Sequence, residues 1–526
     1  MKCRVKKLYF VNSGPMSSGG DDADRTMWLA VVASILISIA TLLYLYLTWN
    51  FNYWKDRGVS GPRPKLFLGT FSSGFTQKEH PVEENNRIYN HYKNDATFIG
   101  GFSFRSPQLF ILSSTLARDI LLKFHKHFQA NDVSIDVSAD PLLARHPFFL
   151  QGEDWRLQRA QVTLAFTSNR LKSLLPLMDN VCSKMDDHIE LEAKLGPIES
   201  KELAAKYTTD VVASCIFGTE GGSFTAEKSE IREISKALLN QTFMFVVLTV
   251  VQSIAPFVRR FVKLSLIPKR IEDFFVGLMG EAIRTRKANG TRQSDYLDYL
   301  IGLQEKKEIS VLDMAAHGVT FFIDGFETTS EVLAFALFEI AMNRDVQKRL
   351  RQEILDTENR EGSLLFETIM EMSFLDQVVN ETLRKWPPAF ALTKVCTEDI
   401  NLELANGKSV MIERGISAIL PIWAIQLDEH HFPDPERFDP GRFSEAEGGH
   451  SAKYYQERGV FLPFGDGPRA CIGRRIGLLQ VKRALVEIVK KYEITISSKT
   501  ILPLRIDPKQ FVVAPLGGIW IDYNKI

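Results

Sequence analysis

Residues 461–477, which read FLPFGDGPRACIGRRIG, contain a loop through which no regular helix or strand can continue. Glycine and proline at residues 465–468 prevent regular structure just before Cys471, whereas apolar residues recur at helical spacing over residues 473–490. Cys471 therefore lies at a loop-to-helix junction, where unpaired backbone N–H groups and the helix dipole favour the thiolate, a good metal ligand. A lone cysteine is more commonly a small buried hydrophobe, so the loop by itself leaves both interpretations open.

The composition excludes several classes of protein. The chain has 526 residues, of which 45% are hydrophobic, so it can bury a large core, and its 36 phenylalanines predict an aromatic-lined interior. Its formal net charge is zero, which excludes bulk electrostatic attraction to nucleic acid. Five cysteines without a closely spaced pair argue against a zinc site or a disulfide framework and favour a reducing environment.

Residues 27–49 are almost uncharged, mostly apolar and long enough to cross a bilayer as a helix. A cleaved signal peptide is the alternative, but it would have a shorter apolar core and a small-residue cleavage site. We therefore expect an uncleaved transmembrane anchor. Residues 50–66, which are basic and rich in proline, are expected to form a linker that stiffens the exit from the membrane.

Basic residues on the two sides of this anchor nearly balance, so the positive-inside rule does not orient a chain that starts at Met1. Translation from Met16 or Met27 would remove most or all of the leading positive charges and place the body of the protein in the cytosol. We therefore hypothesise that residues 1–26 are an extension that the native protein lacks.

The longest helical pattern spans residues 309 to about 350 and contains the polar interruption DGFETTS at residues 324–330. Polar groups and a mid-helix glycine, which costs about 1 kcal/mol relative to alanine, are disfavoured in a buried helix that has no function. The missing side chain of Gly325 opens space beside the helix, where Thr328 could hold a water or a small ligand and Glu327 could supply protons. A solvated helix face is the alternative.

Two further helical segments place an arginine one turn from a possible partner. Trp155 and Arg159, at i and i+4, could hydrogen-bond one anionic group together, although packing plus a surface charge is the commoner interpretation. Glu381 and Arg384, at i and i+3, could pair with each other, and a generic surface pair of this kind contributes little. Neither pair assigns a function by itself.

Residues 238–268 are strongly apolar but too few for a second membrane span. Most runs of this kind belong to the core. A membrane-touching segment through which a substrate enters is an equally good interpretation, and the pattern does not separate the two.

The string Phe-x-x-Gly-x-Arg-x-Cys-x-Gly at residues 464–473 resembles the haem-binding loop of the cytochrome P-450 superfamily. The segment after the anchor is similar to that of microsomal members, particularly those of insects. The resemblance implies a mainly α fold with a smaller β region (α+β), in which residues 67–526 form one catalytic domain behind the N-terminal anchor.

The other motifs occur in the family's order over about 320 residues. Trp155 and Arg159 resemble its haem-propionate site, Glu381 and Arg384 match its Glu-x-x-Arg, and residues 324–329 resemble its oxygen-activation motif. That motif normally begins with a small residue, and Asp324 departs from it, which leaves open how polar and how roomy the groove is.

The resemblance also implies roles for single residues. Cys471 would be the axial thiolate ligand of the iron in a b-type haem, while Glu327 and Thr328 would deliver protons to bound dioxygen. The other residues implied in haem binding are Trp155, Arg159, Gly325, Lys394, Phe464, Arg469 and Gly473. Lys394 stands where many relatives carry an arginine.

A structural role is implied for Glu381 and Arg384, which lock the scaffold on the haem side through a second arginine. Arg437 and Arg442 are the two candidates for that arginine. We favour Arg442, because it follows a Phe-Asp-Pro approach as in the family.

The implied function is insertion of one atom of O₂ into a hydrophobic small molecule whose identity the sequence does not reveal. No flavin or nicotinamide motif is visible, so electrons from NADPH would come through a flavoprotein reductase, with cytochrome b5 as a second candidate donor. The expected docking surface for the reductase comprises Arg474, Arg475, Lys482 and Arg483. A location at the endoplasmic reticulum membrane, with the catalytic domain in the cytosol, follows from the microsomal resemblance.

Two other functions remain possible on these residues. A haem-thiolate isomerase or peroxygenase would need no reductase, although Glu327 and Thr328 argue mildly against it. A membrane-anchored, non-catalytic ligand-binding protein would bind no haem.

Overall fold

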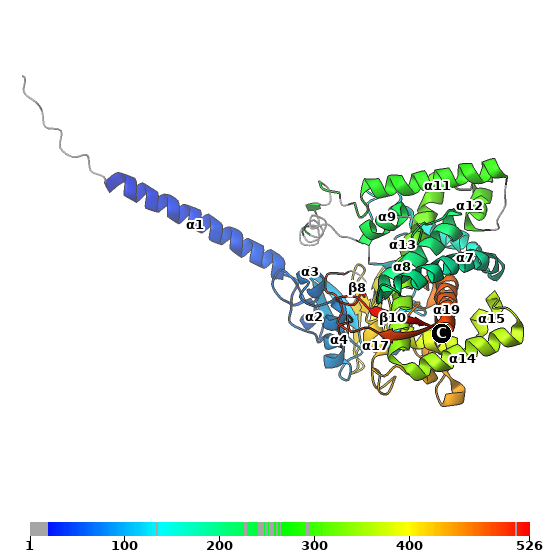
Figure 1. The fold of residues 1–526 in the computed structure, drawn as a ribbon. Coiled ribbons are helices and arrows are strands. Elements are labelled where there is room, and N and C mark those ends of the chain that lie inside the picture. Colours follow the sequence, from blue (N-terminus) through cyan, green and yellow to red (C-terminus); the bar gives the residue numbers. More distant parts are fainter. Residues whose placement is uncertain are drawn as a thin grey trace, which may run out of the picture.

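Helix α13 (Val311–Met342) runs through the middle of the protein, and most of its side chains are buried. The computed structural model describes residues 19–132, 135–225, 229–239, 265–290, 295–306, 308–510 and 513–526, together with residues 247, 251, 257, 258 and 261–263 (Figure 1). At 1.5 Å per residue, α13 is about 48 Å long. A capping box closes its first turn, because the side chains of Ser310 and Asp313 each accept a backbone N–H from the other residue.

This helix ends earlier than the sequence predicts. Asn343 has φ −118° and ψ 84°, and a second helix, α14 (Arg344–Glu361), begins at the next residue. The side-chain amide of Asn343 donates to the carbonyl of Glu339 at 2.8 Å, which satisfies a carbonyl of the last turn. The expectation of one helix from residue 309 to about 350 is therefore wrong, because two helices meet at Asn343.

Aromatic rings fill the space around α13. The ring centroids of Phe275 and Phe322 are 5.0 Å apart, and those of Phe322 and Phe326 are 5.2 Å apart. The helices that pack against α13 include α8 (Ser200–Val212), α11 (Lys269–Asn289), α16 (Ser373–Lys385) and α19 (Arg474–Lys491). The core thus has the aromatic character that the phenylalanine content predicts.

The other helices surround this centre. They are α2 (Tyr53–Asp56), α3 (Ser73–Thr76), α4 (Pro81–Tyr92), α5 (Ser114–Leu121), α6 (Gly152–Thr163), α7 (Ser168–Glu192), α9 (Glu230–Leu239), α12 (Tyr296–Glu305), α15 (Phe366–Glu371), α17 (Ile422–Gln426) and α18 (Ala452–Glu457). Shorter helical turns are η1 (Leu143–Arg145), η2 (Leu164–Phe166), η3 (Ala213–Phe217), η5 (Pro440–Phe443), η6 (Glu445–Glu447) and η7 (Gly467–Arg469). The predicted class, mainly α with smaller sheets, is confirmed.

The largest sheet has the strand order β1-β2-β8-β5-β3, in which β2 and β8 are parallel and the other pairs are antiparallel. Its strands are β1 (Phe98–Ser103), β2 (Ser106–Ile111), β8 (Ser417–Leu420), β5 (Leu392–Val395) and β3 (Ala130–Asn131). The register pairs Lys394 with Asn131 on one side and with Ala418 on the other. This pairing places Lys394 at the edge of the candidate functional site that is described below.

Two smaller sheets complete the β region. One has the order β4-β10-β9, and the other is the hairpin β6-β7, whose turn contains Gly407 at φ +78°. Their strands are β4 (Ile198–Glu199), β10 (Trp520–Lys525), β9 (Tyr492–Ile496), β6 (Ile400–Glu403) and β7 (Ser409–Ile412).

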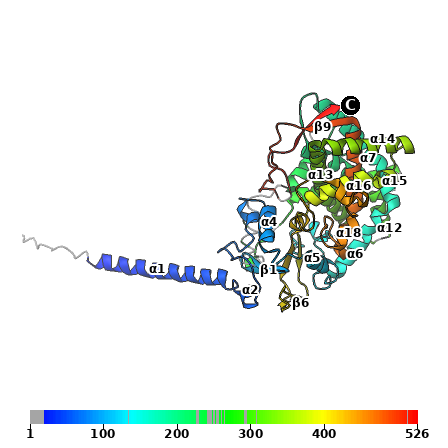
Figure 2. The same cartoon turned by 90° about the horizontal axis from the view of Figure 1, so that it is seen from below.

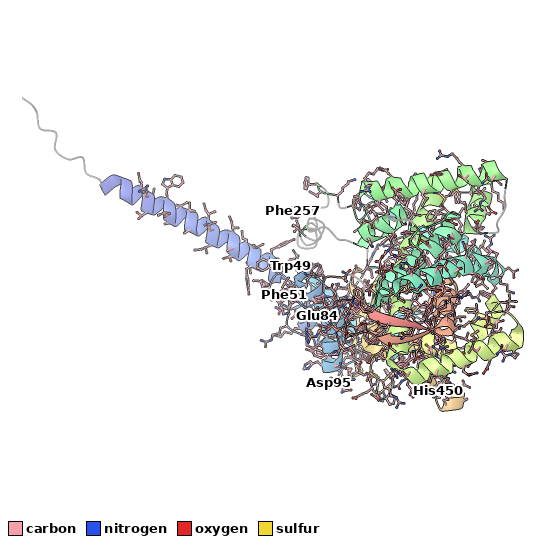
Figure 3. The ribbon with its side chains drawn as sticks, in the orientation of Figure 1. Trp49, Phe51, Glu84, Asp95, Phe257 and His450 are labelled. Atoms are coloured by element: carbon pink, nitrogen blue, oxygen red, sulfur yellow. The ribbon has the colours of Figure 1, made fainter. Side chains whose placement is uncertain are left out.

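Helix α1 (Gly19–Thr48) projects away from the rest of the molecule in both views (Figures 1 and 2). The part of it from Asp24 to Thr48 has a mean hydropathy of 2.3, and none of its most apolar window is buried by protein. It is long and apolar enough to cross a membrane. Trp49 follows it with 71% of its surface exposed, on the side of the domain from which α1 projects (Figure 3).

The segment after α1 is packed onto the domain. Trp54 is buried, and its indole N–H donates to the carbonyl of Gly101 at 2.9 Å. A Cβ at Gly100 would lie 2.1 Å from the Trp54 ring, so glycine is required there. Arg57 pairs with Glu413 at 2.8 Å. The N-terminal part of the expected linker is therefore held against the largest sheet.

Most of the apolar run 238–268 lies outside the described residues. Of its described part, Phe257 and Phe261 are strongly exposed. Phe257 lies on the same side of the domain as Trp49 in the view of Figure 3.

Candidate functional site

Cys471 lies between the 3-10 turn η7 and helix α19, as the sequence predicts, and its side chain is exposed. Its backbone N–H donates to the carbonyl of Phe464 at 2.8 Å, which closes the loop. The φ of Gly467 is +71°, and a Cβ there would lie 2.2 Å from the carbonyl oxygen of Leu121, so only glycine fits. These two contacts therefore fix the backbone of the loop that carries the sulfur.

The protonation of this thiol differs from the prediction. Burial of the sulfur raises the pKa of Cys471 to about 11, and Asp324 adds to the rise, although the backbone N–H groups of Gly473 and Arg474 and the charge of Arg159 lower it. Protein thus surrounds the sulfur on most sides, while the side chain keeps accessible surface; the space beside this surface is called the hollow below. The expectation that the junction alone favours the thiolate is wrong, because the cost of desolvating the charge is larger than the help from two amides. A metal cation at the sulfur reverses this balance.

Three cations gather beside Cys471 without carboxylate partners among the described residues. Arg159 donates to the carbonyl of Ala470 at 2.7 Å. Arg469 donates to the carbonyls of Pro147 and Leu150 at 3.2 and 2.7 Å. Lys394 donates to the side chain of Asn131 at 2.6 Å. All of these acceptors are neutral.

The pKa values of the three cations reflect this shortage of negative charge. Burial and then the charge of Arg469 lower the pKa of Lys394 to about 7. Burial and then Arg159 lower the pKa of Arg469 to about 10, and burial also lowers the pKa of Arg159. The Nε of Arg469 is buried without a hydrogen-bond partner. The cluster therefore lacks an anion, and a ligand with two carboxylates suits it.

Trp155 is part of the same cluster. It is almost fully buried, and the guanidinium carbon of Arg469 lies 4.2 Å from the centre of its ring. The structure thus brings Trp155 and Arg159 of α6, Lys394 of β5 and Arg469 of the Cys471 loop to one place.

The face of α13 that is turned toward the hollow carries Asp324 and Thr328, which are exposed although most of the helix is buried. The hydroxyl of Thr328 donates to the carbonyl of Asp324 at 2.6 Å, which loosens the local helical bonding. A Cβ at Gly325 would meet only Val212, at 3.5 Å, so packing within the protein does not require glycine there. The alternative of a solvated helix face holds for Asp324 and Thr328, which are exposed, but not for Glu327, Thr329 and Ser330, which are buried.

Glu327 points away from the hollow. It is buried and pairs with Lys201 of α8, whose Nζ lies 2.7 Å from its Oε1. Lys201 also donates to the hydroxyl of Ser330 at 2.7 Å. The sequence contains no local sign of this partner, because Lys201 precedes Glu327 by 126 residues.

Glu381 and Arg384 form a fully buried bidentate pair with distances of 2.7 and 2.8 Å. The Nε of Arg442 lies 3.4 Å from Glu381 Oε1, and its side chain is 11% exposed. The side chain of Arg437 is 69% exposed and reaches only Asp439, at 4.0 Å. The structure therefore brings Arg442, not Arg437, to the pair.

Phe464 and Gly473 line the loop around Cys471. Phe464 is half-buried, and the guanidinium carbon of Arg474 lies 5.5 Å from the centre of its ring. A Cβ at Gly473 would lie 3.9 Å from the sulfur of Cys471, an ordinary contact, so the protein alone does not demand glycine there. Both positions remain compatible with a flat ligand above the sulfur.

Two of the four residues expected to dock a reductase are buried or mostly buried and are held in ion pairs. Lys482 is buried and pairs with Asp376 at 2.7 Å, and Arg483 pairs with Asp179 and Glu487 at 2.6 and 2.9 Å. These two residues lie on the face of α19 that packs against the core, which periodicity alone did not reveal. Arg474 and Arg475 are exposed.

The residues present fit a haem. A sulfur ligand opens onto a hollow, and uncompensated cations lie where two propionate groups would be neutralised. Sequence analysis did not identify Lys201, Asn131, His125 or His146, which approach these groups from elsewhere in the chain.

The comparison with known proteins agrees with a haem site built from these residues. The family model described as cytochrome P450 matches residues 60–521. The chain is 37% identical over 509 residues, 95% of its length and 100% of the relative, to "Probable cytochrome P450 28a5" of Drosophila melanogaster. It is 38% identical to "Probable cytochrome P450 28d1" of the same species (93% of this chain, 97% of the relative) and 34% identical to "Cytochrome P450 6j1" of Blattella germanica (94% and 98%). The chain therefore belongs to the cytochrome P450 family and is a monooxygenase-type oxidoreductase.

Proposed function

We propose that this enzyme is a microsomal monooxygenase that receives electrons from NADPH through a flavoprotein reductase and oxidises a hydrophobic small molecule. The observation that carries the proposal is the exposed Cys471 sulfur beside three cations that lack an anion. A haem bound there, with its iron on the sulfur and its propionates on the cations, supplies the activation of dioxygen, which electron donation by the thiolate favours.

The cation cluster would hold the two propionates. Arg159 and Arg469 can each offer a planar fork of N–H donors to a carboxylate, while Lys394 offers a single charged group. Trp155 stacks under Arg469 and keeps its guanidinium plane in one orientation. Phe464 and Gly473 would lie against the flat face of the cofactor on the sulfur side.

Thr328 and Glu327 would handle protons. The hydroxyl of Thr328 can give up its bond to the Asp324 carbonyl and reorient toward a ligand in the hollow. Glu327 is held by Lys201, so a proton that reaches the hollow from the α8 side would pass this pair. The buried Glu381, Arg384 and Arg442 would support the loop side of the site without contacting the substrate.

Helix α1 supports attachment to a membrane, because its apolar surface has no protein cover. We propose residues 27–49 as the anchor and residues 67–526 as the catalytic domain, placed in the cytosol at the endoplasmic reticulum. Exposed Phe257 and Phe261 are consistent with a second contact to the bilayer.

The spectrum of the reduced, carbon-monoxide-bound protein tests the proposal. We expect the long-wavelength Soret band of a thiolate ligand, and Cys471→Ser should abolish it. Cys182→Ala, Cys215→Ala and Cys396→Ala should retain it, because these three cysteines are buried elsewhere. A thiolate band that survives in Cys471→Ser would overturn the assignment. Oxygen consumption that depends on NADPH and added reductase tests the electron source.

A further inference from the structure

Asp324 is an exposed carboxylate in the middle of a largely buried helix. Its side chain is 58% accessible, whereas Phe321, Phe322 and Phe326 around it are buried. A ligand that covers this carboxylate removes it from water, which is costly unless a donor or a cation satisfies the charge. A small residue at this position would carry no such cost, so the charge at Asp324 calls for a partner.

His146 supplies a neutral donor. Its side chain is 4% exposed, and its Nε2 lies 3.3 Å from Asp324 Oδ1. Its Nδ1 accepts the backbone N–H of Phe148 at 3.0 Å, so the ring carries its proton on Nε2 and stays uncharged in this arrangement. His146 therefore orients the carboxylate but does not neutralise it.

The cations on the flanking elements are already paired. Arg145, next to His146, pairs with Asp313 at 2.8 Å, and Lys201 of α8 pairs with Glu327. Among the described residues, no ion pair joins Asp324 to a lysine or an arginine. The carboxylate of Asp324 is therefore available to bind a cationic group of a ligand.

Asp324 faces the same hollow as the candidate metal ligand. Thr328, one turn along α13, is exposed on the same side of the helix, and its hydroxyl donates to the carbonyl of Asp324. Aromatic rings border His146, since the centroid of Phe149 lies 5.3 Å and that of Phe148 6.5 Å from its ring. An anion beside aromatic faces is a suitable environment for an organic cation.

We propose that Asp324, oriented by His146, binds a protonated amine of the substrate, so that the enzyme prefers lipophilic amines to neutral molecules of the same shape. This inference rests on the proposed function and names the substrate class for the same site. The ammonium would donate to the Asp324 oxygen that His146 leaves free, and its apolar body would occupy the rest of the hollow.

The test measures ligand binding to the haem-loaded, full-length enzyme by equilibrium dialysis, so it does not depend on turnover. The probes are a tertiary arylalkylamine that is protonated at pH 7 and its neutral isostere, in which CH replaces the nitrogen. We expect Asp324→Asn to weaken binding of the amine about 10- to 100-fold, as loss of a charge-assisted hydrogen bond does, and to leave binding of the isostere unchanged. Asp324→Ala, which places a small residue at this position, should weaken binding of the amine relative to the isostere by a similar factor.

Asp345→Asn, on the exposed first turn of α14, is the matched control and should change neither affinity. Equal affinity of the wild-type enzyme for both probes, or equal losses for both in Asp324→Asn, would overturn the amine preference. The carbon-monoxide spectrum of each sample separates this outcome from failure of the proposed function. An intact thiolate band without amine selectivity contradicts only the present inference. A wild-type protein without that band contradicts the proposed function.

Discussion

Lys201 Nζ lies 2.7 Å from Glu327 Oε1, and this ion pair joins the first turns of α8 to the centre of α13. The two side chains are 18% and 9% exposed, so little water reaches the charges. The pair holds Glu327 on the α8 side of α13, while Thr328, the next residue, is exposed to the hollow. Two neighbouring polar residues of one motif thus face different surroundings.

Removing Lys201 should destabilise the protein more than removing both partners. Lys201→Met leaves the Glu327 carboxylate buried without a cation, and we expect a loss of about 3 kcal/mol in the free energy of unfolding. The double variant Lys201→Met with Glu327→Gln should recover part of this loss, because no uncompensated charge remains. Urea unfolding of the four proteins of this cycle measures the coupling.

The exposed pair Lys453–Glu457 is the matched control for this cycle, with side chains 81% and 53% exposed. Lys453→Met should change stability by less than about 0.5 kcal/mol. A coupling at Lys201–Glu327 as small as that of the control would show that burial does not strengthen the pair.

Arg442 and Arg437 provide a second matched comparison. Arg442 contacts the buried Glu381, and its Nη2 donates to the carbonyl of Asp434 at 2.7 Å. Arg442→Ala should therefore cost about 1–3 kcal/mol and reduce haem retention. Arg437→Ala should stay within about 0.5 kcal/mol, because that side chain lies mostly in water. Equal effects of the two changes in urea unfolding and haem content would contradict the role of Arg442.

Contacts within one helix could be predicted from the sequence. Glu381 and Arg384 lie three residues apart, and Trp155 and Arg159 four apart, so helical periodicity alone places each pair on one face. The Cys471 loop could be located as well, because glycine and proline mark its start and an apolar periodicity marks the helix that follows it.

Contacts between distant segments could not be predicted. Lys201 of α8 reaches Glu327, and His146, in the loop after η1, reaches Asp324; no periodicity links such positions. The same limit explains Lys482, which was expected at the surface although the packing of α19 buries it. The pKa of Cys471 depends on how many protein atoms surround the sulfur, which a motif does not specify.

Reductase docking should now depend on Arg475 and not on Lys482. Arg475 is exposed and donates only weakly, to the hydroxyl of Ser168 at 3.2 Å, so Arg475→Glu should raise the KM for the reductase several-fold, most clearly at low salt. The carbon-monoxide spectrum should stay unchanged. Lys453→Glu, on the exposed α18, should leave the KM unaltered. An unchanged KM in Arg475→Glu would place the docking surface elsewhere.

Lys394 should make the haem-free protein more stable as the pH rises. Burial, and then the charge of Arg469, lower its pKa from 10.5 to about 7 in the folded state. Between these pH values the unfolded chain binds a proton that the folded chain does not, so the free energy of unfolding increases with pH. The cost of the buried charge is fully present below pH 7. Lys394→Met removes this cost and should stabilise the haem-free protein there by about 5 kcal/mol.

The advantage of Lys394→Met over the wild type should shrink steadily as the pH rises from 7 toward 10.5, because the wild-type lysine then loses its proton in the folded state. Urea unfolding of both haem-free proteins across this window measures the difference, with the exposed Lys408→Met as a control that should show none. With haem bound the sign should reverse. Lys394 then has a propionate to neutralise, so the same substitution should speed haem loss to an acceptor protein. A stability difference that is constant with pH would contradict the uncompensated charge at Lys394.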